Sequence, residues 1–584
     1  MELFKKALDN GQVRSEDDVI LHVAVYKRQV EYFSKKSQAD RLVNYGSKAH
    51  LFIDQHGVEY ARVVLPSIPD TTDAAPYNFR PSDKGKKGSK VVHNKENGVS
   101  TVSKTRLLLM PLRGSQFKNW LAGLMYDTEG KVPNSNALRS AVNVLSNKAR
   151  KNENRHILHN RTAPDPAGNG FWIDMCDKNW RAIHVTEEGW EIVDEPPILF
   201  RRFTHQKPLP VPFKVTEKEE AKTALKLLQF MNLKKEEDKI MFMCSVISYF
   251  VPEIEHPCLC TAGPHGSAKS MFFELTKEIV DPSITGTMSM SNDENGLAQQ
   301  LYHNYFVCYD NLSSLNNWKS DMLCRAVTGA GFSKRKLFTD DEDIIYQFYR
   351  CVGLNGINVS ARKGDLLDRI ILFMLEQIPD EKRKQKSKLL AEFEEERAKI
   401  LGAMLAVLSK AIKLEKEIKL DSFKRLADFH KWGCAIAQAL GYTAEKFNEA
   451  YTAKVELQNE EALSASLIAT ALLEYLKANL DKAEYDSEDE SPIFTFEMTP
   501  TEWFKEVTVF ANYKGIKTSK GYWPSDASHF VRKINEVKPN LEKTGILINR
   551  HSDGSNRSII IDVTKLMNKP KGDDFWDKVI GGST

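Results

Sequence analysis

One eight-residue loop constrains the fold more than any other stretch of this chain. The loop reads Gly263-Pro264-His265-Gly266-Ser267-Ala268-Lys269-Ser270. A short apolar run (258–262) precedes it, and a helix-compatible run (271–275) follows it. Strand, glycine-containing loop, lysine with serine, and then helix is the layout of a phosphate-binding P-loop. The chain is therefore expected to contain an α/β domain whose sheet carries this loop.

The residue types of the loop suit a nucleoside triphosphate. Glycines let backbone N–H groups curl around phosphate oxygens, and the following helix adds the positive end of its dipole. Lys269 is expected to reach the β- and γ-phosphates, and the Ser270 hydroxyl to bind magnesium. Ala268 stands where a glycine is usual, and its methyl group is tolerable only if φ of this residue is negative. The ligands implied are ATP and Mg²⁺.

The composition is that of an ordinary soluble protein. Its 584 residues suffice for three or four domains, and 41% of them are hydrophobic and 28% charged. The net charge is only +3, so any contact with nucleic acid must come from local basic patches. The sequence has neither a membrane-spanning apolar run nor a signal-peptide core at its start. The eight scattered cysteines lack zinc-site spacing and predict free thiols in a reducing cytoplasm.

Residues 1–205 are expected to form an N-terminal α+β domain for DNA binding or oligomerisation. A hairpin pattern pairs residues 49–54 with 60–65. The stretch 66–104 is rich in Pro, Asp, Ser, Lys and Gly, which predicts a flexible insert. Its basic residues suit either a solvated loop or a nucleic-acid contact. These residues are Lys84, Lys86, Lys87 and Lys90.

Two later strand patterns end in polar residues suited to ATP chemistry. Residues 305–309 form a buried-strand pattern that ends in Asp310, whose carboxylate is expected beside the magnesium or, alternatively, on the surface. Asn311 stands where many such ATPases carry a glutamate that activates water. An amide cannot take a proton, so the catalytic base is left open. The pattern 349–354 ends in Asn355, which either orients the attacking water or is a turn residue before Gly356.

A charged pair leads into a further strand pattern. Asp368 and Arg369 precede the apolar run 370–373. Arg369 is a candidate arginine finger, a residue that neutralises transition-state charge on the γ-phosphate held by a neighbouring subunit. An ion pair with Asp365 or Asp368 inside the chain is the alternative interpretation.

These four elements, in this order, resemble the AAA+ core of replicative DNA helicases. The similarity is to superfamily 3 helicases of viruses, phages and plasmids, and to the related MCM-like helicases of mobile elements. In those families an aspartate closes the Walker B strand, an asparagine closes the next, and a Leu-x-x-Arg-aliphatic stretch carries the arginine finger. Asp310, Asn355 and Arg369 match these positions. The resemblance runs from about residue 45 to 565, but its specific motifs lie within 258–378.

The resemblance implies an α/β AAA+ P-loop core over residues 206–378 and a helical lid over 379–480. Ala268 and Asn311 depart from the family pattern, and they affect the expected rate of hydrolysis more than the expected binding of ATP. Within the lid, the stretch 423–429 resembles a helix from which an arginine reaches the nucleotide. Arg425 is therefore a candidate second sensor, or else a surface arginine beside Asp421 or Asp428.

Such helicases also carry a DNA-gripping hairpin between the Walker B strand and the sensor strand. Residues 333–338, an acidic turn at 339–343 and residues 344–348 fit strand, polar tip and strand. The basic residues at the base of this hairpin could contact phosphates in a central pore, and a solvated hairpin is the alternative. They are Lys334, Arg335 and Lys336.

An acidic linker (481–496) separates the lid from a small domain over residues 497–566, and a tail (567–584) follows. A helix is expected from Thr499-Pro500 and a second one from about 525, and a hairpin comes after them. This order resembles a winged-helix domain, which binds either DNA or another protein. For DNA, Arg532 and Lys533 would face a major groove, and Arg550 and Arg557 the flanking phosphates.

Taken together, these features predict an ATP-dependent DNA helicase or translocase, expected to be a hexameric ring. It would act in the cytoplasm in the replication of a phage, plasmid or integrated mobile element. Its expected partners are single-stranded or forked DNA, further copies of the chain, and a primase or other replication proteins. Two other functions stay open: an ATP-switched DNA-binding initiator, and an ATPase of phage defence or DNA remodelling that does not unwind DNA.

Overall fold

The computed structural model describes ten stretches of the chain and two compact units. The stretches are residues 36–66, 105–152, 154–312, 315–335, 343–346, 349–356, 364–482, 493–519, 521–553 and 556–567. The first unit holds the chain up to His159 together with 178–181 and 194–201. The second unit holds 160–177, 182–193 and the chain from Arg202 onward. The predicted insert and tail lie outside the described residues, as does most of the acidic linker.

The first unit packs three helices against a sheet with the strand order β3-β2-β1-β4. Its helices are α3 (Gln38–Gly46), α4 (Ser115–Glu129) and α5 (Ser135–Lys151). Its strands are β1 (His50–Asp54), β2 (Glu59–Pro66), β3 (Thr105–Pro111), β4 (Arg155–His156), β5 (Leu158–His159) and β10 (Leu199–Phe200). Strands β1 and β2 pair in antiparallel register, which confirms the predicted hairpin. Leu42, Leu121 and Leu145 are fully buried where the three helices meet.

The second unit opens with an antiparallel meander of the order β6-β7-β8-β9. Its strands are β6 (Thr162–Pro164), β7 (Gly170–Asp174), β8 (Ala182–Thr186) and β9 (Gly189–Val193). The sequence placed these residues in a domain ending at 205, whereas the structure joins them to the second unit. The reason is packing, because Ile173, Ile183 and Trp190 belong to the same buried core as Leu209 and Leu405.

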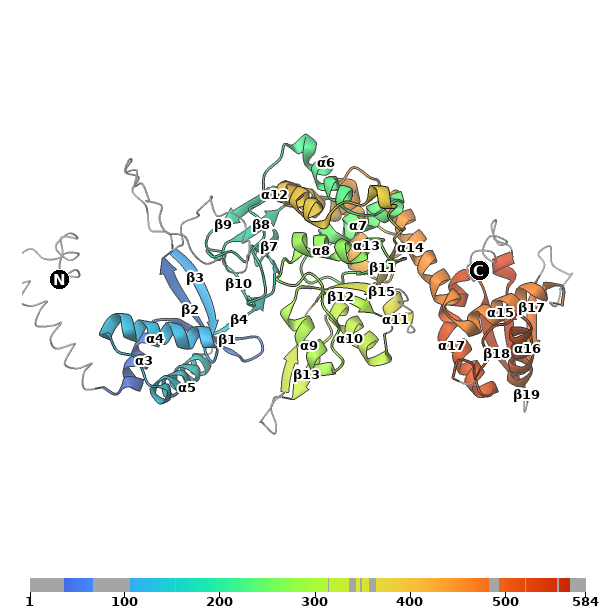
Figure 1. Ribbon diagram of the computed structural model, residues 1–584, viewed down its shortest axis with the longest axis horizontal. Helices are drawn as coiled ribbons and strands as arrows, with labels where there is room; N and C mark the ends of the chain where they lie inside the picture. Colours follow the sequence, from blue (N-terminus) through green and yellow to red (C-terminus); the bar gives the residue numbers. More distant parts are fainter. Residues whose placement is uncertain are drawn as a thin grey trace, which may run out of the picture. The chain divides into compact units, whose positions relative to one another are not determined.

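A four-stranded parallel sheet forms the centre of the second unit (Figure 1). Its strands are β11 (Cys258–Ala262), β12 (Phe306–Leu312), β15 (Cys351–Gly356) and β16 (Ile370–Met374), in the order β12-β15-β11-β16. The surrounding helices are α7 (Glu236–Ser248), α8 (Lys269–Val280), α9 (Glu294–His303), α10 (Asn317–Thr328) and α11 (Gly364–Leu367). Because every strand runs the same way, all four carboxyl ends reach one edge of the sheet. The predicted α/β class is confirmed.

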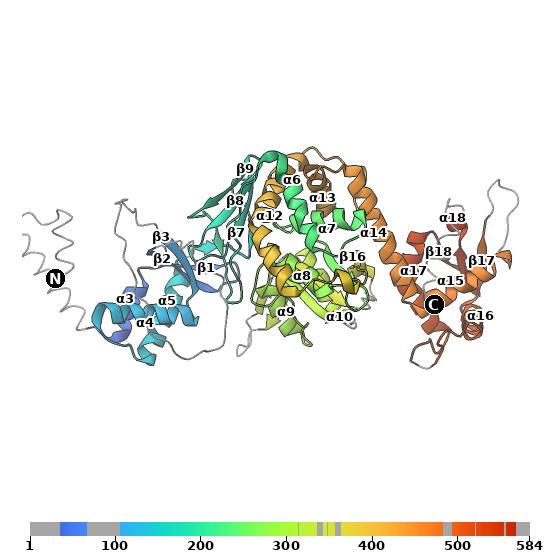
Figure 2. The ribbon, with the colours of Figure 1, turned by 45° about the horizontal axis from the view of Figure 1, so that its top comes forward.

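Helices fill the segments before and after this sheet. Those before it are η1 (Glu217–Glu219), α6 (Glu220–Ala224) and η2 (Leu225–Phe230); those after it are η3 (Asp380–Lys382), α12 (Lys386–Glu415), α13 (Ala427–Ala439), α14 (Ala444–Ser464), α15 (Leu467–Ala478) and η4 (Leu480–Lys482). Figure 2 shows α12 running beside α6. Helix α14 covers β16, the edge strand, and the Lys454 ammonium donates to the Leu372 carbonyl at 2.8 Å. Gln458 donates to the Ile370 carbonyl in the same way, so the free edge is partly satisfied by side chains.

The C-terminal part packs helices on a three-stranded antiparallel sheet of the order β17-β19-β18. Its elements are β17 (Thr495–Met498), α16 (Pro500–Tyr513), α17 (Ala527–Thr544), β18 (Leu547–Asp553), β19 (Asn556–Asp562) and α18 (Thr564–Met567). A capping box between Thr499 and Glu502 starts α16, which confirms the helix start predicted there. Trp503 is fully buried, and its indole N–H donates to the Ile559 carbonyl at 2.9 Å.

Candidate nucleotide-binding site

The loop between β11 and α8 has the backbone that a P-loop requires. Strand β11 is buried along its whole length, and α8 begins at Lys269. Gly263 has φ +141°, and a Cβ built on it would lie 2.2 Å from the Leu375 carbonyl oxygen. Gly266 has φ +78°. Only glycine adopts these positive φ angles without strain, and only glycine leaves room for the Leu375 carbonyl at position 263. The shape of the loop therefore requires both glycines.

Ala268 corrects a prediction made from the sequence. We expected a negative φ at this position, but the structure gives Ala268 φ +65° and ψ 28°, in the left-handed region. The residue occupies the conformation that the usual glycine would adopt. An L-residue in this region is strained by roughly 1–2 kcal/mol, so this loop keeps its shape in spite of the alanine.

The Lys269 side chain folds back onto the backbone of the P-loop. Its Nζ donates to the Gly263 carbonyl at 2.7 Å and to the Pro264 carbonyl at 2.8 Å. The ammonium group therefore sits in the hollow of the loop, beside the backbone that would hold phosphate oxygens. That placement fits a nucleoside triphosphate, which needs a cation at this point.

Ser270, Asp310 and Asn355 meet at the carboxyl edge of the sheet. The Ser270 hydroxyl donates to Asp310 Oδ2 at 2.9 Å, and the Asn355 amide donates to the other carboxylate oxygen of Asp310. Thr261, at the end of β11, donates to Asn355 Oδ1 at 3.3 Å. Four elements thus place one carboxylate, two hydroxyls and one amide around a common point.

This donor set fits magnesium. Mg²⁺ is held in such sites by one or two carboxylates and by substrate phosphates, and the rest of its shell is water. Ser270 and Asp310 supply one hydroxyl and one carboxylate at hydrogen-bonding distance from each other. Within the described ranges no group of three or more His, Cys, Asp and Glu side chains gathers to hold a metal without such phosphates.

Asn311 is turned out of its strand. It has φ +57°, and the pairing of β12 with β15 shifts register between Tyr309 and Leu312. Asparagine tolerates the left-handed region better than most residues. The exposed side chain carries an amide, which has no basic atom for a proton, so the identity of a catalytic base stays open.

The two candidate arginines lie at the other edge of the sheet. Cys258 N–H donates to the Arg369 carbonyl at 2.8 Å, so Arg369 stands where β11 begins. The five residues of β11 span ~15 Å at about 3.3 Å per residue, and the P-loop starts after them. Arg369 therefore lies at the edge of the sheet opposite its own P-loop.

Asp365 binds both of these arginines. Arg369 donates to a carboxylate oxygen of Asp365 at 2.6 Å, and Arg425 pairs with the same oxygen at 3.0 Å. The hydrogen bond from Arg369 lowers the pKa of the Asp365 carboxyl below its usual value. The pair inside the chain that the sequence left as an alternative is thus present. Arg425 pairs with Asp365 near the amino-terminal edge of the sheet, where Arg369 also lies.

Sequence reasoning missed two polar residues near the site. Thr261 lies under Asn355, and Thr287 donates to Asp310 Oδ2 at 3.5 Å. The signal at Thr261 was a hydroxyl at the end of an otherwise apolar buried run. Thr287 had no such signal, because it lies in a segment without regular pattern, next to a lone bridge between Met288 and Tyr309.

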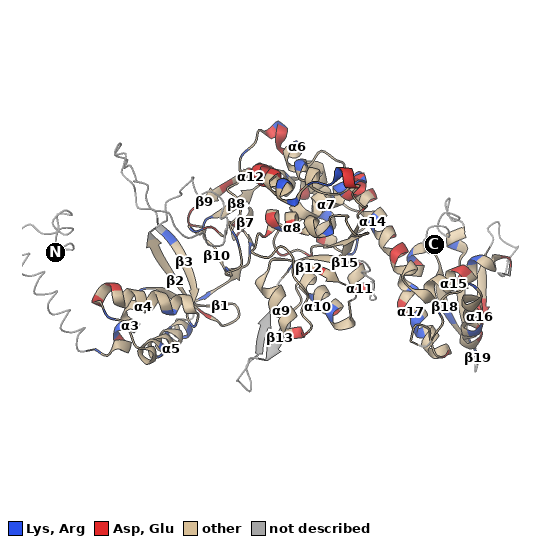
Figure 3. Cartoon of the chain, in the orientation of Figure 1, with Lys and Arg blue, Asp and Glu red and all other residues tan. Residues whose placement is uncertain are grey.

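The predicted DNA-binding residues that the structure describes fall on two hairpins and one helix. Lys334 and Arg335 stand on β13 (Phe332–Arg335), which pairs with β14 (Asp343–Tyr346) as the predicted hairpin. Their side chains and the whole of Lys336 lie outside the described residues. Cations and anions are interspersed along α17, where Lys533 pairs with Glu536 at 2.8 Å (Figure 3). Three further predicted contacts are exposed: Arg532, Arg550 and Arg557.

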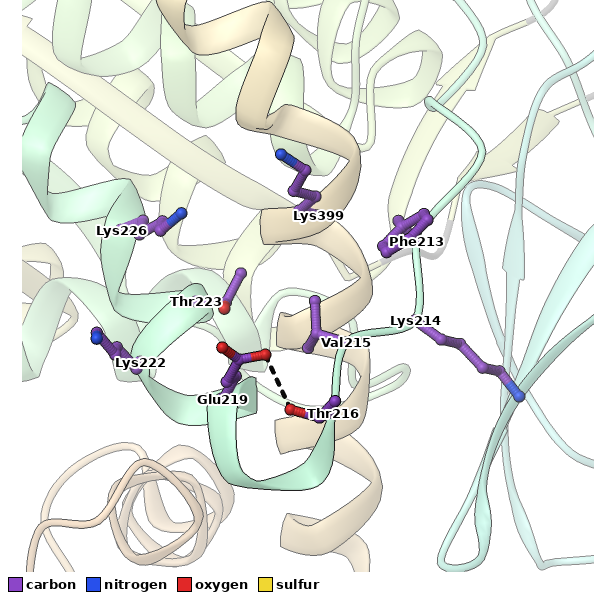
Figure 4. Close-up of a pocket in the computed structure, with 9 residues that line it drawn as sticks. All are labelled: Phe213, Lys214, Val215, Thr216, Glu219, Lys222, Thr223, Lys226 and Lys399. Carbon is purple, nitrogen blue, oxygen red and sulfur yellow. Dashed lines mark hydrogen bonds between the residues drawn. The ribbon is translucent and has the colours of Figure 1, made fainter.

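A cavity of about 380 Å³ lies along α12, and no P-loop residue lines it (Figure 4). Its wall consists of Phe213, Lys214, Val215, Thr216, Glu219, Lys222, Thr223, Lys226 and Lys399. Two of its lysines share one carboxylate, since Lys226 and Lys399 lie 2.9 and 3.1 Å from Glu396 oxygens. Lys214 points away from the other drawn side chains, toward the Trp190 ring at 5.2 Å. These pairs leave the cavity a weaker candidate for an anion than the P-loop.

Two family models match most of the second unit. Residues 224–460 match the replication protein of actinomycete integrative conjugative elements, and residues 468–571 match the C-terminal domain of the RepA protein of these elements. Over these residues the chain is similar to RepA. The first RepA-like region contains the P-loop together with Asp310, Asn355, Arg369 and Arg425. No curated protein matches the chain.

Solved structures give weaker likenesses. The apo C-terminal region of NrS-1 aligns over 90% of this chain and 98% of its own length, with 11% identity and a TM-score of 0.34. The JCV helicase aligns over 40% of this chain and 67% of its own, with 13% identity and a TM-score of 0.22. Neither likeness bears on the chemistry of the site.

Two general findings complete the description. All eight cysteines are free thiols, and all but Cys176 are buried. In the part of the chain that the structure describes, each helix is too short or too polar to cross a membrane.

Proposed function

We propose that this chain is the ATPase subunit of a ring-shaped DNA helicase or translocase that serves replication of an integrated conjugative element. One observation carries the proposal. Lys269, Ser270, Asp310 and Asn355 come from separate strands and a helix, yet they meet at the carboxyl edge of one parallel sheet. The match to RepA over residues 224–460 supports the replication context.

The strand order supports an AAA+ core. Strand β11, which precedes the P-loop, lies between β15, which carries Asn355, and β16, which follows Arg369. Strand β12, with Asp310, lies beyond β15. In the C-terminal part, α16, α17 and the hairpin β18–β19 follow the order of a winged helix. We assign residues 206–378 to the AAA+ core and 497–566 to a winged-helix domain on these grounds.

Each residue has a role that follows from its contacts. Lys269 would balance phosphate charge, and Ser270 with Asp310 would hold Mg²⁺, which supplies further positive charge to the phosphates when bound. Asn355 donates to Asp310 and so fixes the orientation of the carboxylate that faces the metal. The same amide lies 3.3 Å from the Ser270 hydroxyl, and from there it would also orient a water toward the terminal phosphate.

The position of Arg369 supports a site shared between subunits. It stands at the amino-terminal edge of the sheet, across the length of β11 from its own P-loop. In a head-to-tail ring, one edge of each subunit faces the opposite edge of the next. Arg369 would then reach the nucleotide of a neighbour and stabilise charge there.

The test uses the purified full-length chain with Mg²⁺, ATP and forked DNA. Lys269→Ala and Asp310→Asn are each expected to lower DNA-stimulated ATP hydrolysis by ~100-fold or more, because each removes a charge that faces the phosphates or the metal. Strand separation should fall in parallel. Lys413→Ala, which removes an exposed lysine from α12, is the matched control and should hydrolyse ATP as the wild type does. DNA-stimulated hydrolysis that survives Lys269→Ala would refute the proposal.

Asn311 favours a second candidate function. Since an amide cannot accept a proton at this position, the chain would hydrolyse ATP slowly and use nucleotide binding as a switch for assembly on DNA. The same preparation separates the two functions. A switch-type initiator would bind one DNA sequence in the presence of ATP with negligible turnover, and it would leave the fork paired.

A further inference from the structure

The segment after β16 lies along the P-loop and is bonded to it. The Leu375 N–H donates to the Ala262 carbonyl at 2.8 Å, and the Ile378 N–H donates to the Gly266 carbonyl at 3.2 Å. We call residues 375–383 the P-loop strap. Its backbone approaches Gly263 so closely that a side chain there would collide with the Leu375 carbonyl.

Asn232 ties the strap and the loop together from a third segment. Its side-chain amide donates to the Ser267 carbonyl at 3.1 Å and to the Glu376 carbonyl at 2.7 Å. The strap therefore keeps its position relative to the loop, and so does any side chain that the strap presents.

Arg383 ends the strap beside Gly266. A Cβ built on Gly266 would lie 2.9 Å from Arg383 Nη2, so the guanidinium rests against the backbone of the loop. Its partners belong to its own segment: Asp380 lies at 2.7 Å, and the Ile378 carbonyl accepts from Nε at 3.2 Å. The Asp380 side chain is 86% exposed and that of Arg383 is 47% exposed. An ion pair this open to water holds an arginine only weakly.

We propose that Arg383 contacts the phosphate groups of the nucleotide bound on its own P-loop. The inference rests on the proposed function, because it requires that the loop binds a nucleoside triphosphate. A guanidinium presents several N–H donors in a plane and binds phosphate oxygens in pairs. Lys269 approaches the hollow of the loop from the helix side, and Arg383 stands at the strap side. Arg369 and Arg425 pair with Asp365 at the other edge of the sheet, whereas Arg383 stands beside Gly266 of the P-loop.

The experiment is equilibrium titration of a fluorescent ATP analogue into the full-length chain with Mg²⁺. Arg383→Ala is expected to weaken binding ~10- to 100-fold, which is the usual effect of losing a charged hydrogen-bonded contact. Arg383→Lys should recover part of this loss because it restores the charge without the paired donors. Lys382→Ala, the neighbouring exposed cation in η3, is the control and should bind as the wild type does.

Two readouts separate a phosphate contact from a structural effect. The loss should be much smaller for a fluorescent adenosine without phosphates, and the unfolding midpoint of the nucleotide-free chain should not change. Equal losses for both ligands, or a lowered midpoint, would mean that Arg383 only supports the strap and would overturn the inference. If Arg383→Ala binds ATP normally while Lys269→Ala does not, the inference fails and the proposed function stands. If the wild-type chain binds no ATP, both fail.

Discussion

Ala268 and Asn311 each hold a backbone conformation that L-residues seldom adopt. Their φ angles are +65° and +57°, and both flank the place where phosphates and metal would lie. Such residues persist only where the surrounding structure imposes the conformation. At Ala268 the constraint comes from the neighbouring loop, whose glycines are fixed on one side by the strap. At Asn311 the constraint comes from the shift in register between β12 and β15.

Replacing Ala268 by glycine is expected to stabilise the protein. Glycine removes the left-handed strain of roughly 1–2 kcal/mol, and this gain exceeds the ~0.5–1 kcal/mol that glycine costs in backbone entropy. The free energy of unfolding should rise by ~1 kcal/mol or less, and urea denaturation measures it. Ala406→Gly, inside α12, is the control and should lower stability by about 1 kcal/mol. A loss of stability at both positions would show that Ala268 is not strained.

A buried ionic cluster joins the far end of α8 to the start of β12. The Asp281 carboxylate binds Arg161 Nη2 at 2.8 Å and lies 3.5 Å from the Lys277 ammonium. It also accepts from the backbone N–H groups of Tyr305 and Phe306 at 3.1 and 3.0 Å. Burial alone would raise the pKa of Asp281, but Lys277, Arg161 and these N–H groups lower it to about 2. The cluster thus fixes where β12 begins relative to the end of α8.

Asp281→Asn should destabilise the second unit by about 3–5 kcal/mol, because it leaves two cations buried without their counter-ion. The pKa of Asp281 is lower in the folded chain than in the unfolded one, so its contribution is complete above about pH 4 and is lost as the pH falls toward 2. Thermal unfolding measured at several pH values checks both statements. Glu392→Gln, in an exposed pair with Lys384, is the control and should leave the unfolding temperature close to that of the wild type. A small effect at Asp281 would contradict the role given to the cluster.

Local sequence was sufficient where one segment determines its own shape. The P-loop with its flanking strand and helix, the β1–β2 hairpin and the start of α16 could all be predicted because glycines, caps and alternation act within a few residues. Contacts between segments that are far apart in the sequence could not be predicted in this way. Lys454 reads as a surface lysine on a helix, but it is buried, pairs with Asp238 and donates to the edge strand β16. Arg383 likewise carries no local signal, because the Gly266 backbone that it contacts is distant in the sequence.

At the scale of the whole molecule, the residues of the proposed ATP site lie at opposite edges of one sheet. Lys269, Ser270 and Asp310 stand at the carboxyl edge, and Arg369 stands at the amino edge. If a ring brings these edges together, each site takes one half from each of two subunits. Two inactive variants with damage in different halves would then complement each other, whereas damage in the same half would not be repaired.

Mixing Lys269→Ala with Arg369→Ala tests this arrangement directly. The Arg369→Ala subunit keeps an intact P-loop, and the Lys269→Ala subunit keeps an intact arginine. In an equal mixture, half of the subunits carry an intact P-loop, and half of the subunits next to them carry an intact Arg369. About one quarter of the interfaces should therefore combine the two intact halves. DNA-stimulated ATP hydrolysis should therefore rise to ~25% of the wild-type rate. The control mixture, Lys269→Ala with Asp310→Asn, damages the same half in both partners and should stay inactive. An inactive first mixture would place Arg369 outside the site and would remove the structural reason for a ring.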